Sequence, residues 1–170
     1  KMSFYCQFAK LIGEFVDPAI HLENQNLGWG LVPFGTRTSL GPIKLLAEFR
    51  IGSRGFLFNY WDRVYDLNRV SIVNTEIVTK ESQLYQYGKL KGFYARADLS
   101  MINLFNLSMG YQNMQGEKWE TTLADYKSDE SNQTFLATIG INSSLLPKIG
   151  KAEAFYEQSN VTNPFDFSPT

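Results

Sequence analysis

Strict alternation of apolar and polar residues is the feature that most constrains this chain. It runs through residues 92–112, GFYARADLSMINLFNLSMGYQ, with one short break in the middle. Successive side chains of a β-strand point to opposite faces, so the stretch predicts strands at about 92–101 and 106–115 joined by a short turn. One face of this hairpin carries apolar or aromatic side chains throughout: Phe93, Ala95, Ala97, Leu99, Met101, Leu107, Met109 and Tyr111.

Weaker alternation elsewhere predicts an all-β fold, an antiparallel up-and-down meander of about eight or nine strands in one domain spanning residues 1–170. Residues 56–65 also group on one side of a helix, but we favour a strand there. No segment has a convincing amphipathic helix pattern. The expected strands cover about 3–12, 28–40, 43–51, 56–65, 70–79, 92–101, 106–115, 134–142 and 150–157.

The composition argues against several classes of function. The 16 basic and 17 acidic residues nearly balance, and no basic stripe suggests nucleic acid. Cys6 is the only cysteine and His21 the only histidine, so an internal disulfide and the usual zinc sites are excluded. We expect Cys6 to be a small buried apolar residue and His21 to lie in a loop. Motifs for catalysis, phosphate binding or metal binding are absent from the sequence, so we expect no catalytic residues, no cofactor and no enzyme activity.

Targeting segments give little information. The longest uncharged stretches are too polar for a membrane-spanning helix. The chain opens KMSFYCQFAKLIG, which lacks the apolar run of a signal peptide, and we expect any such leader to have been removed.

The alternating strands suit either of two barrels, one with a protein core inside and one with lipid outside. Connection lengths favour lipid, because short turns near 40–43, 102–106 and 143–148 alternate with long polar loops at 13–26, 80–91 and 116–132. Outer-membrane barrels have this asymmetry. Aromatic residues end the apolar faces away from the short turns, as expected at a lipid interface. The interface aromatics are Phe49, Phe93, Tyr111, Phe135 and Tyr156.

Charges also favour lipid outside, because the opposite, polar faces carry both signs and would line a wet lumen. The predicted lumen-lining residues are Lys44, Glu48, Arg50, Arg63, Arg96, Asp98, Lys151 and Glu153. Arg63 belongs to the cluster NYWDRVYDLNR, which fits a constriction that selects anions and stacks solutes on aromatic rings. The same cluster also fits an aromatic interface belt with lumen ion pairs, which we favour.

Two other interpretations stay open. A soluble lipocalin-like barrel that binds a small apolar ligand would take about this length, and GWG at residues 28–30 resembles a short lipocalin signature. An adhesion or structural β-module would show neither conductance nor ligand uptake.

Three segments resemble the strand–turn–strand units of bacterial outer-membrane β-barrel proteins: LGPIKLLAEFR, GFYARADLSMINLFNLSMGYQ and TFLATIGINSSLLPKIGKAEAFYEQ. The resemblance implies a transmembrane β-barrel in the bacterial outer membrane with lipid as its partner. It implies passive, porin-like passage of small polar solutes, or a scaffold that presents loops. Members of this class often end on a strand with a terminal aromatic residue, whereas this chain ends DFSPT. We therefore expect a segment of a larger barrel.

Overall fold

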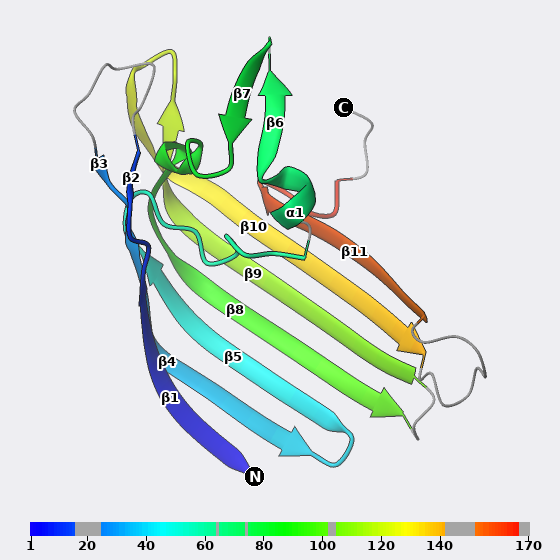
Figure 1. Cartoon of the computed structure of the whole chain (residues 1–170). Coiled ribbons are helices and arrows are strands. Elements are labelled where there is room, and N and C mark those ends of the chain that lie inside the picture. Colours follow the sequence, from blue (N-terminus) through cyan, green and yellow to red (C-terminus); the bar gives the residue numbers. More distant parts are fainter. Residues whose placement is uncertain (16–24, 64, 74, 102–104, 142–151, 167–170) are drawn as a thin grey trace.

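The chain folds around one antiparallel sheet of seven strands (Figure 1). The computed structural model describes residues 1–15, 25–63, 65–73, 75–101, 105–141 and 152–166. Strands that neighbour one another in the sheet also follow one another along the chain, which confirms the all-β antiparallel meander. The sheet strands, in order, are β1 (Met2–Lys10), β4 (Trp29–Leu40), β5 (Ile43–Gly52), β8 (Tyr87–Met101), β9 (Phe105–Glu120), β10 (Asp125–Ile141) and β11 (Ala152–Val161).

The two ends of the sheet differ in their connections. β4 and β5 meet at a tight turn in which Gly41 takes a left-handed φ of 60°. This short-turn end holds the N-terminus, whereas the long connections lie at the opposite, long-loop end (Figure 1). The predicted alternation of short turns and long loops is observed in part. A tight turn joins β4 to β5 and a long connection joins β5 to β8, whereas only residues 121–124 join β9 to β10 at the long-loop end.

The predicted closure into a barrel is not observed. β1 and β11 are the two edges of the sheet, and they pair with no further strand in the described part of the chain. Both edge strands run from the short-turn end to the long-loop end, because the first and the last strand of a seven-stranded antiparallel sheet have the same direction. Direct closure would thus need a parallel seam, which up-and-down barrels avoid.

Residues 53–86, which we call the insertion, replace the strand expected at 56–65. This segment forms turns, a one-turn helix α1 (Tyr65–Asn68), a ribbon of β6 (Val70–Val73) with β7 (Glu76–Thr79), and a short 3-10 helix η1 (Leu84–Gln86). The strand prediction for 56–65 was wrong because Phe56 and Leu57 are consecutive and both buried, which a strand of a one-sided sheet does not allow. The ribbon at 70–79 is separate from the main sheet.

The predicted polar loop at 116–132 is instead the tip of a long hairpin. β9 continues to Glu120 and β10 starts at Asp125, with the turn between them. Trp119 and Tyr126 face each other across this hairpin, with ring centroids 5.1 Å apart. A polar sequence hid these strands, because Trp119 and Tyr126 are the only aromatic residues at the tip and the rest of it is mostly polar. A further two-stranded ribbon joins β2 (Glu14–Phe15) to β3 (Gln25–Asn26).

A β-bulge in β4 explains why its alternation is irregular. Leu31 pairs with Ile51 and Phe34 with Phe49, so β4 has one more residue here than β5. Pro33 lies in the bulge, where its missing N–H breaks no ladder. As a result, Leu31 and Phe34 share one face of the sheet although their sequence spacing is odd.

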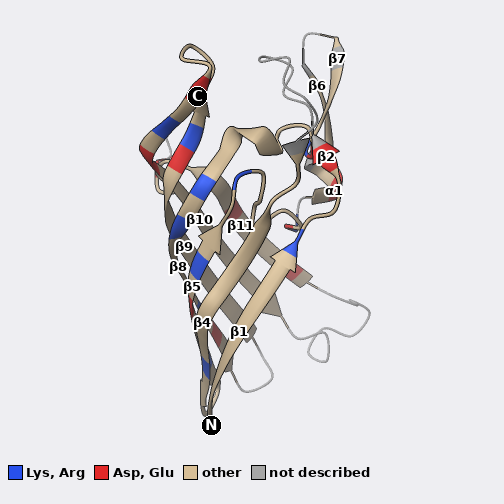
Figure 2. Ribbon diagram, turned by 90° about the vertical axis from the view of Figure 1, so that its left-hand side faces the viewer, with Lys and Arg blue, Asp and Glu red and all other residues tan. Residues whose placement is uncertain are grey.

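The hydrophobic core lies at the long-loop end, between the sheet and the insertion. Leu27, Leu57, Tyr60 and Leu84 form its buried centre. Phe56 packs directly over Gly30, where a Cβ would lie only 2.2 Å from the Phe56 ring. The insertion therefore covers one face of the sheet, which we call the inner face; the opposite side is the outer face (Figure 2).

Candidate functional site

The outer face of the sheet is apolar and exposed. Ala97, Ile139 and Ala154 all lie on it and are exposed, Ile139 to 49%. Cys6 is also exposed here, which corrects the expectation of a buried cysteine; it lies on the same side of β1 as its large neighbours. The large exposed apolar residues of this face include Phe4, Phe8, Phe34, Ile43, Leu45, Phe93, Met101, Leu107, Met109 and Ile141.

A row of aromatic side chains crosses the outer face, and we call it the aromatic belt: Phe34, Phe49, Phe93, Tyr111, Phe135 and Tyr156. Phe49 and Phe93 lie 5.1 Å apart between ring centroids. Phe135 lies 6.1 Å from Tyr156. The five aromatic residues predicted from the sequence therefore lie on adjacent strands in one row. Phe34 and Phe165 were missed; Phe165 packs 5.1 Å from Phe135 and 6.1 Å from Tyr111.

The polarity of the two faces inverts across the aromatic belt on β8, β9, β10 and β11. Towards the short turns their outer face is apolar, and towards the long loops it carries the polar residues Lys91, Asn113, Gln115, Gln133 and Gln158. On β1, β4 and β5 the outer face beyond the belt stays apolar, at Phe8, Trp29 and Ile51. On the inner face beyond the belt, the apolar residues Leu90 and Met114 are buried, Met114 to 2% exposure. We call the two parts of the sheet the short-turn half and the long-loop half. Charged residues gather on the β9–β10 hairpin of the long-loop half (Figure 2).

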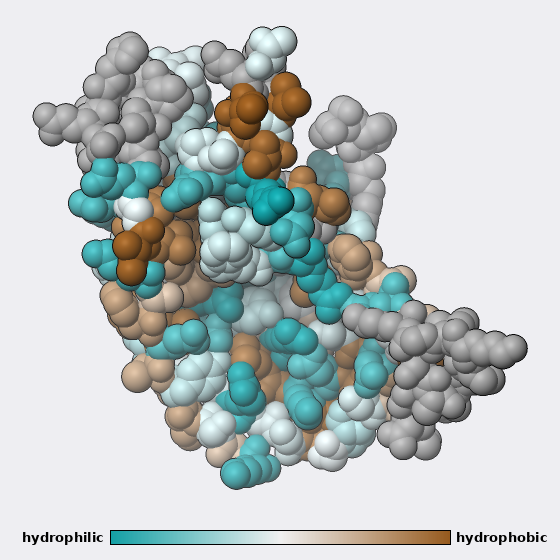
Figure 3. Space-filling view, in the orientation of Figure 1, coloured by the Kyte–Doolittle hydropathy of each residue, from teal (hydrophilic) through white to brown (hydrophobic). Residues whose placement is uncertain are grey.

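The inner face of the short-turn half is hydrophilic (Figure 3). At its upper limit, Arg50 and Glu48 form a buried ion pair of 2.6 Å, with side-chain exposures of 13% and 8%. Arg50 donates a second hydrogen bond of 2.6 Å to Oε1 of Gln112, and its guanidinium lies 3.8 Å from the Tyr94 ring centroid. Glu48 also accepts a short hydrogen bond from the Tyr5 hydroxyl, which β1 places above the bare Gly35.

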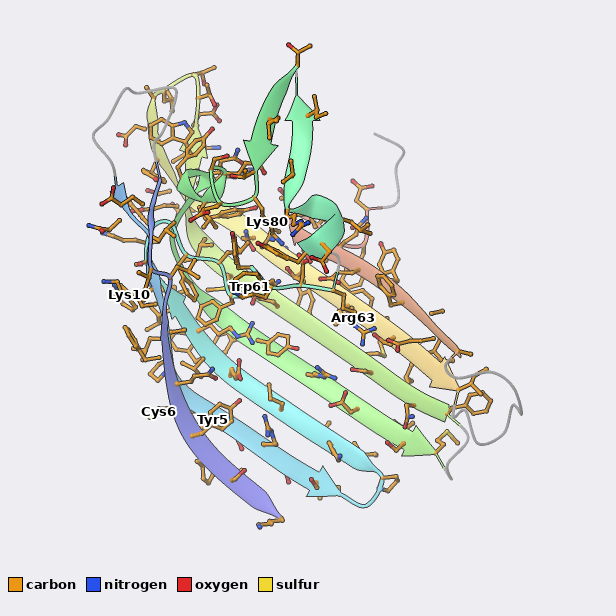
Figure 4. All side chains as sticks on the ribbon, viewed as in Figure 1. Tyr5, Cys6, Lys10, Trp61, Arg63 and Lys80 are labelled. Carbon is orange, nitrogen blue, oxygen red and sulfur yellow. The ribbon has the colours of Figure 1, made fainter. Side chains whose placement is uncertain are left out.

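A groove of about 400 Å³ opens lower on the inner face. We call it the lower groove. Two ion pairs line it: Arg96 with Asp98 at 2.8 Å, and Arg63 with Glu153. Arg63 reaches Glu153 of β11 from the insertion, which Figure 4 shows in front of the sheet.

The other predicted lumen-lining residues take no part in these two ion pairs. Lys44 lies on the inner face opposite Asp98 in the register of β5 and β8, and its side chain is exposed. Lys151 and His21 lie outside the described residues. Thus the structure brings Arg63, Arg96, Asp98 and Glu153 together in one groove, while Glu48 and Arg50 form a separate network.

Contacts that the sequence did not reveal hold the insertion together and attach it to the inner face. Lys80 pairs with Asp62 at 2.8 Å, and both side chains are largely buried. Asn59 donates a 2.8 Å hydrogen bond from Nδ2 to Oγ1 of Thr134 on β10. The Trp61 and Tyr65 rings lie 4.4 Å apart between centroids in a tilted arrangement. Asn59 and Thr134 are far apart in sequence, so the sequence pattern could not predict the contact that joins the insertion to β10.

Contacts in the long-loop half shift the pKa values of Glu117 and Tyr60, among other groups. The hydrogen-bonded Arg54 guanidinium, 2.8 Å from Glu117, lowers the pKa of that carboxyl. Burial raises the pKa of Tyr60 to about 12, and its hydrogen bond with Tyr65 contributes in the same direction. Both groups are thus held in their usual charge states at neutral pH.

In the described ranges, no three His, Cys, Asp or Glu side chains gather closely enough to hold a metal ion. Nor is any helix there long and apolar enough to cross a membrane. Comparisons with protein-family models, with curated proteins and with solved structures found no match. The function must therefore be argued from the faces of the sheet.

Proposed function

We propose that this sheet is part of the wall of an outer-membrane β-barrel, with its outer face in lipid and its inner face lining a polar lumen. The inversion of polarity across the aromatic belt, on the four strands β8 to β11, carries the proposal. A protein core or a partner protein on the outer face would not by itself require polar residues to begin beyond a row of aromatic rings. A lipid boundary requires this change, because aromatic rings favour the headgroup level and the parts of the strands beyond the headgroups meet water.

The geometry of the belt supports this proposal. Between Phe49 and Tyr156 the belt crosses four strand pairings and shifts by four residues towards the short-turn end. At about 4.8 Å per strand and 3.3 Å per residue, the shift corresponds to a strand tilt of roughly 35°. Membrane barrels have tilts of about 35–45°.

The height of the apolar band on the outer face also agrees with a membrane barrel. From Phe93 to Met101, β8 presents an unbroken apolar outer face. Eight residue steps at about 3.3 Å and a tilt of roughly 35° span about 22 Å. The apolar band of bacterial barrels is about 25 Å tall.

The free edges of β1 and β11 place a requirement on this barrel. Unpaired backbone N–H and C=O groups are too costly in hydrocarbon to be left open to lipid. We therefore infer that further strands, from other chain segments or other copies, complete the wall. The insertion would then lie inside the lumen and narrow it at the long-loop end.

The transport mechanism would be passive. Ion pairs along the inner face, from Glu48–Arg50 to Arg63–Glu153, would hydrate a path and set its electric field without any chemical step. Removing one guanidinium at the lower groove leaves a carboxylate in excess. We expect Arg63→Ala or Arg96→Ala to shift the reversal potential in planar bilayers towards cation preference. Unchanged reversal potentials in both variants would remove the channel function.

A soluble lipocalin-like carrier is the main competing function. It needs an apolar inner cavity and a hydrated outer face. In the short-turn half, however, most of the large exposed apolar side chains point outwards, Phe155 being an exception, and ion pairs point inwards. This arrangement favours the membrane barrel.

The test uses the alternation itself. In a Cys6→Ser background, single cysteines at positions 95 to 99 are labelled with an environment-sensitive fluorophore and the protein is refolded into lipid vesicles. We expect blue-shifted emission, quenched by brominated acyl chains, at Ala95, Ala97 and Leu99, and water-like emission at Arg96 and Asp98. Gln115, on the outer face beyond the belt, is the matched control and should resist quenching by brominated chains. Uniform or reversed alternation would overturn the proposal.

A further inference from the structure

The lower groove carries no net charge from the residues that line it. Its two guanidinium groups, of Arg63 and Arg96, are each paired with a carboxylate, of Glu153 and Asp98. Arg63 and Arg96 are 43% and 41% exposed, so N–H groups remain available to a solute. An anion or a cation would meet one favourable and one opposing charge at each pair. A neutral solute with hydrogen-bond donors and acceptors would be repelled by neither the guanidinium nor the carboxylate of a pair.

A hydroxyl in this groove also lacks a partner. Thr138 lines the groove and is 8% exposed, and its Oγ1 is buried without a hydrogen-bond partner among the described residues. A buried polar atom left unpaired is unfavourable, so the site suits a ligand or an ordered water that both donates and accepts. A hydroxyl group of a solute does both.

The groove keeps open space beside Thr138. Gly140 lies two residues further along the same face of β10, and a Cβ built there would meet no atom closer than 3.9 Å. The volume of about 400 Å³ lies within the range of small-molecule sites. The groove is therefore wide enough for a ring-sized solute next to the unpartnered hydroxyl.

We propose that the lower groove binds an uncharged polyhydroxylated solute of the monosaccharide class. Arg63 and Arg96 would donate to its oxygens, Asp98 and Glu153 would accept from its hydroxyls, and Thr138 would complete the ring of contacts. This inference deepens the proposed function and rests on it, since it names the solute class that the lumen retains during passage.

Calorimetry of the full chain in detergent micelles tests the inference with three ring-shaped probes. We expect saturable binding of D-glucose and at least tenfold weaker binding of D-glucuronate and D-glucosamine, which add one charge of either sign to the same ring. Absence of saturable glucose binding overturns the inference, as does equal binding of either charged sugar.

Variants locate the site. Gly140→Leu should fill the groove and abolish glucose binding. Thr138→Val, which keeps the shape and removes the hydroxyl, should weaken it by about 3- to 10-fold, the effect of one neutral hydrogen bond. The matched control is Thr36→Val, because Thr36 Oγ1 is also buried without a partner but lies on β4, opposite Phe4 of the outer face. Glucose binding that survives Gly140→Leu, or that falls equally in Thr36→Val, contradicts the assignment.

Vesicle swelling separates this inference from the proposed function. Swelling in glucose without saturable binding in micelles would keep the channel and overturn the sugar site. Saturable binding without swelling would keep the site and overturn passage. Swelling together with saturable binding supports both.

Discussion

The short-turn half and the long-loop half of this sheet use the same strands in opposite ways. In the short-turn half, apolar side chains point outwards and ion pairs lie on the inner face. In the long-loop half, Leu90 and Met114 point inwards towards a conventional core, while Lys91 and Gln115 point outwards. The change takes place along the aromatic belt, within the continuous strands β8 and β9.

This comparison teaches that the surroundings, rather than the strand, decide which face carries apolar residues. Backbone hydrogen bonds continue through the belt without interruption between Phe93 and Leu90. Apolar side chains of the sheet leave water in different ways on each side of the belt: Leu90 and Met114 are buried on the inner face beyond it, and the outer-face residues below it would contact the proposed lipid. Four substitutions test or sharpen the contrast, from the largest expected effect to the smallest.

Removing the cation from the buried inner-face network should have the largest effect. Arg50→Ala leaves Glu48 almost fully buried with only the Tyr5 hydroxyl as partner. We expect the free energy of unfolding to fall by about 3–5 kcal/mol, measured by urea titration in vesicles. Arg96→Ala is the control, because its pair with Asp98 is 41% and 35% exposed, and it should lose less than about 1 kcal/mol. If both variants lost the same unfolding free energy, the two ion pairs of the inner face would be equally hydrated.

Truncation of the long-loop core comes next. Leu84 is 1% exposed at the centre of the core, so Leu84→Ala should cost about 2–5 kcal/mol of unfolding free energy through the cavity it leaves. Leu67→Ala, at a leucine that is 79% exposed, should change it by less than about 0.5 kcal/mol. The measurement is chemical unfolding followed by tryptophan fluorescence. A silent Leu84→Ala variant would show that the insertion adds no stability.

A charge on the outer face should discriminate between the two halves directly. Ala97→Arg places a guanidinium in the apolar band and should cost about 2–4 kcal/mol when the protein is refolded into vesicles. Gln115→Arg introduces the same charge on the same face beyond the belt, where we expect no more than about 1 kcal/mol. If both variants lose the same stability, the belt does not mark a lipid boundary.

The smallest effect concerns pH in the long-loop half. The pKa of Glu117 is lowered below its ordinary value of 4.5, so its carboxylate stabilises the fold above that pH and the contribution is lost as pH falls through the lowered pKa. Arg54 is 48% exposed, which limits the contribution to less than about 1 kcal/mol. Unfolding free energies measured between pH 3 and pH 7 should therefore decline less steeply for Glu117→Gln than for the unmodified chain. Parallel pH profiles would rule out the contribution.

The strands with clean alternation could be predicted from the sequence over about two thirds of their length, from the short-turn end. Residues 92–101 and 106–115 fall within β8 and β9, and the faces assigned to Phe93, Arg96 and Tyr111 are those in the structure. A period of two places each side chain on a face whatever lies beyond it, so these faces needed no tertiary information.

The segments that failed are those whose partners are distant. Residues 56–65 looked like a strand because aromatic residues recur there, yet Phe56 packs on Gly30 and Tyr60 on the core. The tips of β9 and β10 looked like a loop because their residues are mostly polar and show no clean alternation, although Trp119 packs against Tyr85 and Tyr126 there. Within the candidate site, Arg96 and Asp98 could be paired from sequence, but the reach of Arg63 to Glu153 could not.

By itself, the sequence determined the strands, their faces and the row of aromatics, because these depend on local periodicity. Only the tertiary structure decided that the sheet stays open between β1 and β11, that the insertion folds onto the inner face, and that polarity inverts at the belt. The physical reason is that these features depend on contacts between residues far apart in the chain, and on the solvent that each part of a strand meets.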